Sequence, residues 1–193
     1  MIINNIFKNL KKLDKKLYVK SLILYHCAPT IFCNKPSTII TIEDFDMSFF
    51  KSWRDLKDEI YRDYKIEFFE IKLQNKKLTA IIYKQDKLET IIKRNIDFLL
   101  NFGYREYMTT KDMLKHLKSR YNYSCPHELG VFLGIPIDDV RDFICNKGEC
   151  KLCGYWKVYN DVEYAKQTFR LYDEAKTRAI DIIKSKFLDN NVA

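Results

Sequence analysis

Apolar residues recur at helical spacing along much of the chain. Five large ones, separated by four, three, four and four positions, predict a helix that begins near Ser48 and buries a single stripe: Phe49, Trp53, Leu56, Ile60 and Tyr64. Similar spacing predicts helices over 87–102 and 112–121, and a long helix that opens at Asp161. Each of these helices has an apolar face that another element must cover.

A period of two replaces the helical period between residues 66 and 83. Phe69, Ile71 and Leu73 alternate with polar residues, and a second apolar run follows over 78–83. The polar connection between these runs predicts an antiparallel hairpin. The β-branched run 38–42 predicts a third short strand.

The last third of the chain has a different character. Four of the five glycines and four of the six cysteines lie within residues 125–154, where tight turns are therefore expected. Two short helices, 127–133 and 137–145, are predicted around the connection Gly134-Ile135-Pro136, followed by a strand over 155–159.

No internal repeat or linker divides the chain. We therefore predict a single α+β domain over 21–193, with a small, mainly antiparallel sheet covered by helices and a helix-rich C-terminal part. Residues 1–20 are expected to form a basic N-terminal helical segment in front of it.

The net charge of +8 is concentrated in that first segment. It contains six lysines and one aspartate, a net of +5, which leaves +3 for the other 173 residues. Such a segment can contact nucleic-acid phosphates, through Lys8, Lys11, Lys12, Lys15 and Lys16. No aromatic residue separates these lysines, so a solvated helix face is the alternative interpretation.

The short apolar run that follows the lysine-rich segment lacks a signal-peptide cleavage site. No stretch approaches the ~18 uncharged apolar residues of a membrane span, so we expect a cytoplasmic protein.

Two groups of residues are candidates for holding a ligand or a metal. Cys145, Cys150 and Cys153, with Cys125 and His127 as further ligands, have the residue types of a structural zinc site, whereas reduced thiols are the alternative. The ligand candidates lie in two proline-containing clusters and on the predicted strand after them: His26, Cys27, Thr30, His127, Glu128, Tyr155, Trp156 and Lys157. We expect the two clusters to meet around one pocket, with Tyr155-Trp156-Lys157 as its third wall. Capped helix ends explain the same residues without a ligand.

The segment 129–144 has the small, turn and apolar positions of a helix-turn-helix. They are Gly130, Gly134, Ile135, Val140 and Phe143. The second helix carries Asp138, Asp139 and Asp142, and acidic groups repel phosphate. A corner of two helices that packs into the core is therefore favoured over a DNA reader.

Several short motifs resemble those of a known family. They are His26-Cys27-Ala28-Pro29-Thr30, Lys35-Pro36, Gly103-Tyr104, Pro126-His127-Glu128-Leu129-Gly130-Val131-Phe132-Leu133-Gly134, Pro136 with Asp139-Val140, Asn146-Lys147-Gly148 and Gly154-Tyr155-Trp156-Lys157-Val158-Tyr159. Together they resemble the bacterial domain-of-unknown-function family 3793 over about residues 22–172. The resemblance implies a small cytosolic protein of low-GC anaerobic bacteria, and it implies no activity.

The function that these observations favour is a non-enzymatic binding, adaptor or regulatory module that acts on another macromolecule, most directly another protein. Catalytic triads, phosphate loops and nucleophile elbows are absent from the sequence. Two alternatives remain open: a redox-, haem- or metal-related protein or enzyme with a His/Cys/Glu pocket, and a nucleic-acid binder, or modulator of a nucleic-acid enzyme, that uses the lysine-rich start. The sequence specifies neither a cofactor nor an oligomeric state.

Overall fold

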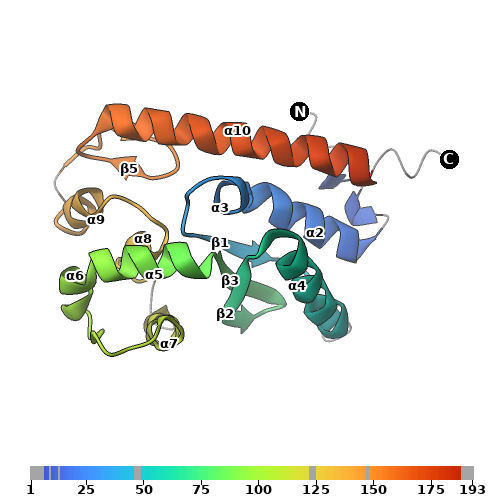
Figure 1. The fold of residues 1–193 in the computed structure, drawn as a ribbon, viewed down its shortest axis with the longest axis horizontal. Coiled ribbons are helices and arrows are strands. Elements are labelled where there is room, and N and C mark those ends of the chain that lie inside the picture. Colours follow the sequence, from blue (N-terminus) through green and yellow to red (C-terminus); the bar gives the residue numbers. More distant parts are fainter. Residues whose placement is uncertain are drawn as a thin grey trace.

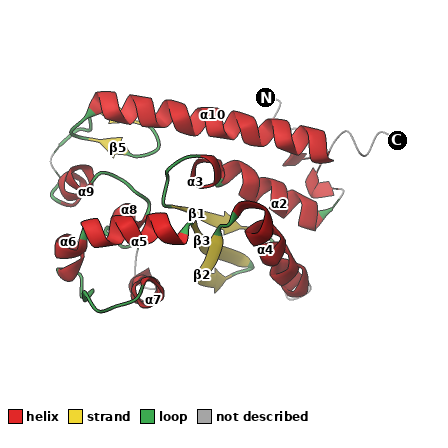
Figure 2. Cartoon of the chain, viewed as in Figure 1, coloured by secondary structure: helices red, strands yellow, loops and turns green. Residues whose placement is uncertain are grey.

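A computed structural model describes residues 7–8, 10–12, 14–45, 49–121, 125–146 and 148–187. Figure 1 shows the chain as a ribbon, and Figure 2 separates its helices, strands and loops. The elements in chain order are α2 (Lys15–His26), α3 (Ala28–Phe32), β1 (Ser37–Ile42), α4 (Phe50–Tyr64), β2 (Glu67–Gln74), β3 (Lys77–Tyr83), α5 (Gln85–Arg94), α6 (Ile96–Leu100), α7 (Thr110–Tyr121), α8 (Leu129–Phe132), α9 (Ile137–Ile144), β4 (Leu152–Cys153), β5 (Lys157–Val158) and α10 (Val162–Phe187).

The three longer strands form one antiparallel sheet with the order β1-β3-β2, which confirms the predicted sheet. The turn between β2 and β3 consists of Asn75 and Lys76, which both have a positive φ, of 50° and 57°. Turns of this kind match the twist of the flanking strands, which is why this short polar connection makes a hairpin. A two-stranded hairpin, β4-β5, lies separately near the start of α10.

Helices cover both faces of the three-stranded sheet. On one face, Ile42, Leu78 and Ile82 belong to a core cluster shared with α2, α3, α4 and the second half of α10. On the other face, Ile71 and Ile81 belong to a cluster shared with α5 to α9. Successive strand residues point to opposite faces, so β3 contributes to both clusters. The fold is therefore α+β, as predicted.

The apolar stripe predicted for the helix that begins near Ser48 is found in α4. Trp53, Leu56 and Ile60 are buried against the sheet, and Trp53 Nε1 donates to Glu70 Oε1 at 2.8 Å. Burying an aromatic group of this size is a major source of stability. The predicted start near Ser48 lies outside the described residues, and the helix is described from Phe50.

Two predicted elements are shorter than expected. The helix predicted over 87–102 is interrupted at Asn95, whose side-chain Nδ2 donates to Ile91 O at 2.8 Å and so competes with the backbone ladder. The strand predicted over 155–159 is reduced to β5, because the chain reverses just before it and Gly154 N donates to Trp156 O at 3.1 Å.

The longest helix, α10, runs along one side of the molecule and joins its two ends (Figure 1). Its second half contacts α2 and α3, whereas Ala165 and Tyr172 in its first half pack with Trp156 and Val158 of the β4-β5 region. Like every other helix in the described part of the chain, it is not apolar enough to cross a membrane.

Candidate functional site

A pocket of about 400 Å³ lies where α8, α9 and the β4-β5 hairpin meet. Most of its lining is apolar, and four of the predicted ligand candidates line it. The lining residues are Cys125, Pro126, His127, Leu129, Gly130, Leu133, Ile135, Asp139, Val140, Phe143, Tyr155, Trp156 and Lys157. His127 on one side therefore faces the same cavity as the Tyr155-Trp156-Lys157 wall, which is the geometry of a small ligand site.

The walls α8 and α9 approach each other closely because of Gly130. A Cβ atom at this position would lie 2.9 Å from Val140 Cγ2, which is too close for any side chain. The turn between the helices needs Gly134, whose φ of +77° is unfavourable for other residues and whose Cβ would lie 2.5 Å from Pro36 Cδ. Two glycines thus set the helix corner that forms the back of the pocket.

A buried carboxylate, Asp139, ties α9 to the hairpin. Its side chain accepts hydrogen bonds from Trp156 Nε1 at 2.8 Å, from the backbone N of Tyr159 and of Asn160 at 2.9 Å, and from Asn160 Nδ2 at 3.0 Å. Only 2% of Asp139 is exposed. Because four donors share this carboxylate, it fixes the position of the Trp156 wall.

An exposed aromatic ring stands in the lining of the pocket. Phe143 is 45% exposed, its ring lies 5.6 Å from the His127 ring in an edge contact, and Lys157 Nζ lies 5.5 Å from its centre. His127 and Lys157 are themselves exposed. An apolar cavity is therefore accompanied by one large apolar group and two groups that can carry positive charge.

Tyr155 links the pocket to the neighbouring surface of α10. Its hydroxyl donates to Asp173 Oδ1 at 2.7 Å, and Lys176 Nζ lies 4.4 Å from its ring centre and 5.5 Å from that of Tyr25. Partial burial, together with the Asp173 carboxylate, raises the pKa of the Tyr155 hydroxyl. Tyr155 is thus held in place by groups of α10 that do not line the pocket.

The first predicted cluster does not line this pocket. His26 is exposed at the end of α2, where partial desolvation and the Lys176 ammonium lower its pKa. Cys27 is fully buried, which raises the pKa of its thiol. Thr30 is also buried, and its hydroxyl pairs with that of Thr38 at 2.8 Å, joining α3 to β1.

Glu128 is next to His127 in sequence but points into the core. It is 0% exposed, forms a salt bridge with Arg120 and lies 3.5 Å from the Tyr104 hydroxyl, which donates to it. A buried carboxylate with these partners serves the packing of α7 against the segment that precedes α8. The two members of this cluster therefore have different surroundings, one in the pocket lining and one in the interior.

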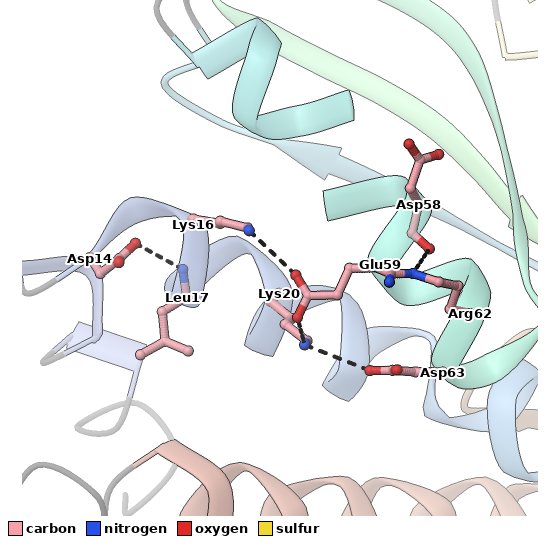
Figure 3. A network of polar contacts seen from close by, with 8 residues as sticks. All are labelled: Asp14, Lys16, Leu17, Lys20, Asp58, Glu59, Arg62 and Asp63. Carbon is pink, nitrogen blue, oxygen red and sulfur yellow. Dashed lines mark hydrogen bonds and ion pairs between the residues drawn. The ribbon is translucent and has the colours of Figure 1, made fainter. Parts of the chain in front are cut away.

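The lysine-rich start is held against acidic side chains of other elements. Lys11 Nζ lies 2.9 Å from Asp44 Oδ2, Lys15 Nζ donates to Asp44 O at 2.5 Å, and Lys16 Nζ lies 3.4 Å from Glu59 Oε2. Lys20 also pairs with Glu59 and joins α2 to α4, as Figure 3 shows. Lys8 and Lys12 are exposed and form no ion pair with any described residue.

The six cysteines are free thiols. Cys145 and Cys153 are exposed and Cys150 is half-buried. Within the described ranges, no group of three or more His, Cys, Asp or Glu side chains is placed to hold a metal ion.

Sequence reasoning missed the roles of two residues that line the pocket, Asp139 and Phe143. The sequence pattern gives Asp139 the same repulsive role as Asp138 and Asp142, but the Asp139 side chain is buried in the structure. Phe143 is one of the apolar positions of the helix corner that is predicted to pack into the core, but it is 45% exposed. The available signal for Asp139 is its spacing from Pro136, since residues three apart lie on the same side of a helix.

Comparisons with known proteins identify a family and no function. The sequence model of a family described as "Protein of unknown function (DUF3793)" matches residues 23–191. No curated protein and no solved structure matches the chain.

Proposed function

Because the chain belongs to the DUF3793 family, whose function is unknown, we propose from its own geometry that it is a protein-binding module that takes a large apolar side chain of a partner into the pocket beside α9. The observation that carries the proposal is the pairing of an apolar cavity of about 400 Å³ with a half-exposed Phe143. Partly exposed aromatic groups beside such cavities are typical anchors of protein interfaces.

The rigidity of the pocket supports this proposal. Its corner is set by Gly130 and Gly134, and its Trp156 wall is held by Asp139. A preformed cavity loses little conformational freedom when a ligand enters, so more of the contact energy appears as affinity.

The charges of the lining predict what lies beside the apolar anchor. Lys157 forms no ion pair with a described residue. Asp139, the only carboxylate among the described residues that line the pocket, is already bound by four donors. A carboxylate of the partner can therefore pair with Lys157 and accept a hydrogen bond from the His127 ring. We expect the binding motif to be a Trp, Phe or Leu next to Asp or Glu.

The alternatives from other classes have less support. Cys27 and Glu128 are fully buried, so neither is available to a redox or haem ligand. Three lysines of the start already have acidic or carbonyl partners within the protein. These pairings reduce the charge that a nucleic acid could use.

Selection of short random peptides displayed on phage against the full chain tests the proposal. We expect enriched peptides to share the apolar and acidic motif and to bind Phe143→Ala about tenfold more weakly or worse. Phe50→Ala is the matched control, because Phe50 is 41% exposed on α4 and does not line the pocket. The proposal is wrong if no motif is enriched, or if both variants weaken binding equally.

A further inference from the structure

A second concavity lies between α5, α10 and the loop that follows α3. This groove has a volume of about 730 Å³, larger than that of the pocket. Its lining residues are Phe32, Cys33, Asn34, Pro36, Lys87, Thr90, Ile91, Arg94, Gly134, Tyr164, Thr168, Leu171 and Tyr172. Among these described lining residues two are cations and none is an acid, so the groove carries positive charge.

The cations lie along one stripe of α5. Lys87 and Arg94 are seven residues apart, which is about two helical turns or ~10 Å along the axis, and Thr90 and Ile91 lie between them on the same face. Arg94 forms no ion pair with a described residue, and Lys87 has only Asp86, with a closest oxygen at 3.9 Å. Both side chains can therefore accept a carboxylate from outside.

The opposite wall is a stripe of α10. Tyr164 and Leu171, also seven residues apart, are 51% and 52% exposed, and Thr168 lies between them. Large apolar groups that remain half exposed along a groove are typical of a surface that a partner covers. The two stripes run along facing helices for about the same length.

The acids near the groove do not neutralise it. Asp86 begins the same stretch of α5 but does not line the groove. Burial and the nearby Glu174 carboxylate raise the pKa of the Cys33 thiol. Glu174 Oε1 accepts a hydrogen bond from Arg170 Nε at 3.1 Å. Lys87 and Arg94 therefore have no counter-charge among the described residues that line the groove.

We propose that this groove binds an acidic amphipathic helix of a partner protein, at a site distinct from the pocket. A helix with acidic residues at positions i and i+7 and apolar residues at i+3 and i+4 matches the two cations and the apolar groups between them. Ile91, Leu171 and Phe32 provide apolar contacts that a phosphate backbone cannot use. The lining therefore favours a protein helix over a nucleic acid.

The groove and the pocket are lined by neighbouring residues of the same segment. Leu133 and Ile135 line the pocket, whereas Gly134 between them lines the groove. The rings of Tyr155, from the pocket, and Tyr172, from the groove, lie 5.1 Å apart in an edge contact. Two partners could thus be held side by side on one rigid support.

A library of displayed helical peptides, randomised at positions i, i+3, i+4 and i+7, tests the proposal against the full chain. We expect selection of Asp or Glu at i and i+7 and of large apolar residues between them. Lys87→Glu combined with Arg94→Glu should weaken the selected peptides about tenfold or more, because it reverses both charges. Lys93→Glu combined with Lys111→Glu changes the net charge equally outside the groove and should leave binding within about twofold.

Other outcomes overturn the proposal. They are selection without acidic residues, equal weakening by the two double variants when both melt like the wild type, and a single-stranded oligonucleotide that binds the groove in place of the peptide. Phe143→Ala should not change binding of these peptides, so failure of the groove proposal and failure of the pocket proposal can be told apart.

Discussion

Two regions of this chain contain charged or aromatic side chains that a partner could contact. They differ in how many of these side chains already have partners within the protein. In the lysine-rich start, Lys11, Lys16 and Lys20 each lie beside an acid of another element, Asp44 or Glu59. Around the pocket, Phe143 remains half exposed, and Lys157 has no acidic partner among the described residues. In the first region the lysines form ion pairs with other parts of the protein, whereas in the second Phe143 and Lys157 remain available to a partner.

The difference shows that an excess of charge in a sequence does not measure the charge that a partner can reach. The start carries +5 of the total of +8, yet the Lys20 ammonium, by its hydrogen bond, holds the pKa of Glu59 below its ordinary value. Groups that the fold has not already used are the better indication of a binding site.

The largest effect is expected at the carboxylate that supports the pocket. Asp139→Ala leaves Trp156 Nε1 and the backbone N of Tyr159 and Asn160 without their acceptor, so it should lower the free energy of unfolding by about 3 kcal/mol. Urea denaturation followed by tryptophan fluorescence measures this loss.

Asp138→Ala is the control for that substitution. Asp138 is exposed on the same helix and lies 3.6 Å from Arg141, so its removal should change stability by no more than about 0.5 kcal/mol. Equal losses in the two variants would show that the buried carboxylate does not hold the hairpin.

A second effect concerns Lys35, which forms no ion pair with a described residue. Lys35 Nζ donates to Leu133 O at 2.5 Å behind the pocket wall, and burial lowers its pKa to about 7. Between pH 7 and the ordinary pKa of lysine, the unfolded chain therefore binds more protons than the folded one, and stability rises with pH. Below pH 7 the ammonium is buried at its full cost.

The measurement for Lys35 is a difference. The free energy of unfolding of the wild type, minus that of Lys35→Met, should increase by about 1.5 kcal/mol from pH 7 to pH 8.5. The wild type alone is less informative at higher pH, because burial raises the pKa of the Cys27 thiol. The contribution of this thiol to the free energy of unfolding therefore decreases as the pH rises above the ordinary pKa of cysteine. A difference that stays flat or falls with pH would contradict the buried, neutral amine.

Much of the fold follows from local patterns in the sequence. The spacing of Trp53, Leu56 and Ile60 predicts the buried face of α4, and the alternation around Ile71 predicts the hairpin. The break at Asn95 was not predicted, because it depends on one side chain that captures a carbonyl in place of the helical ladder.

The candidate site was predictable only in part. Prolines and amphipathic side chains indicated His127 and Tyr155-Trp156-Lys157, which line the pocket. The inward direction of Asp139 and the exposure of Phe143 depend on how α9 ends against the hairpin. The groove could not be predicted either, since its walls α5 and α10 are far apart in sequence and no local pattern places them together.

The smallest effect is expected in the lysine-rich start. Lys20 is 14% exposed and pairs with Glu59, with Asp63 at 3.7 Å, so Lys20→Met should lower the free energy of unfolding by about 0.5 to 1 kcal/mol at low salt. Salt screens partly exposed pairs, so the loss should shrink as sodium chloride is raised in urea denaturation. Lys12→Met, at an exposed lysine without an ion pair to a described residue, should have no measurable effect at either salt concentration. An equal loss at Lys12, or a Lys20 loss that salt leaves unchanged, would mean that ion pairs do not fasten this segment, and its lysines would again be candidates for an external partner.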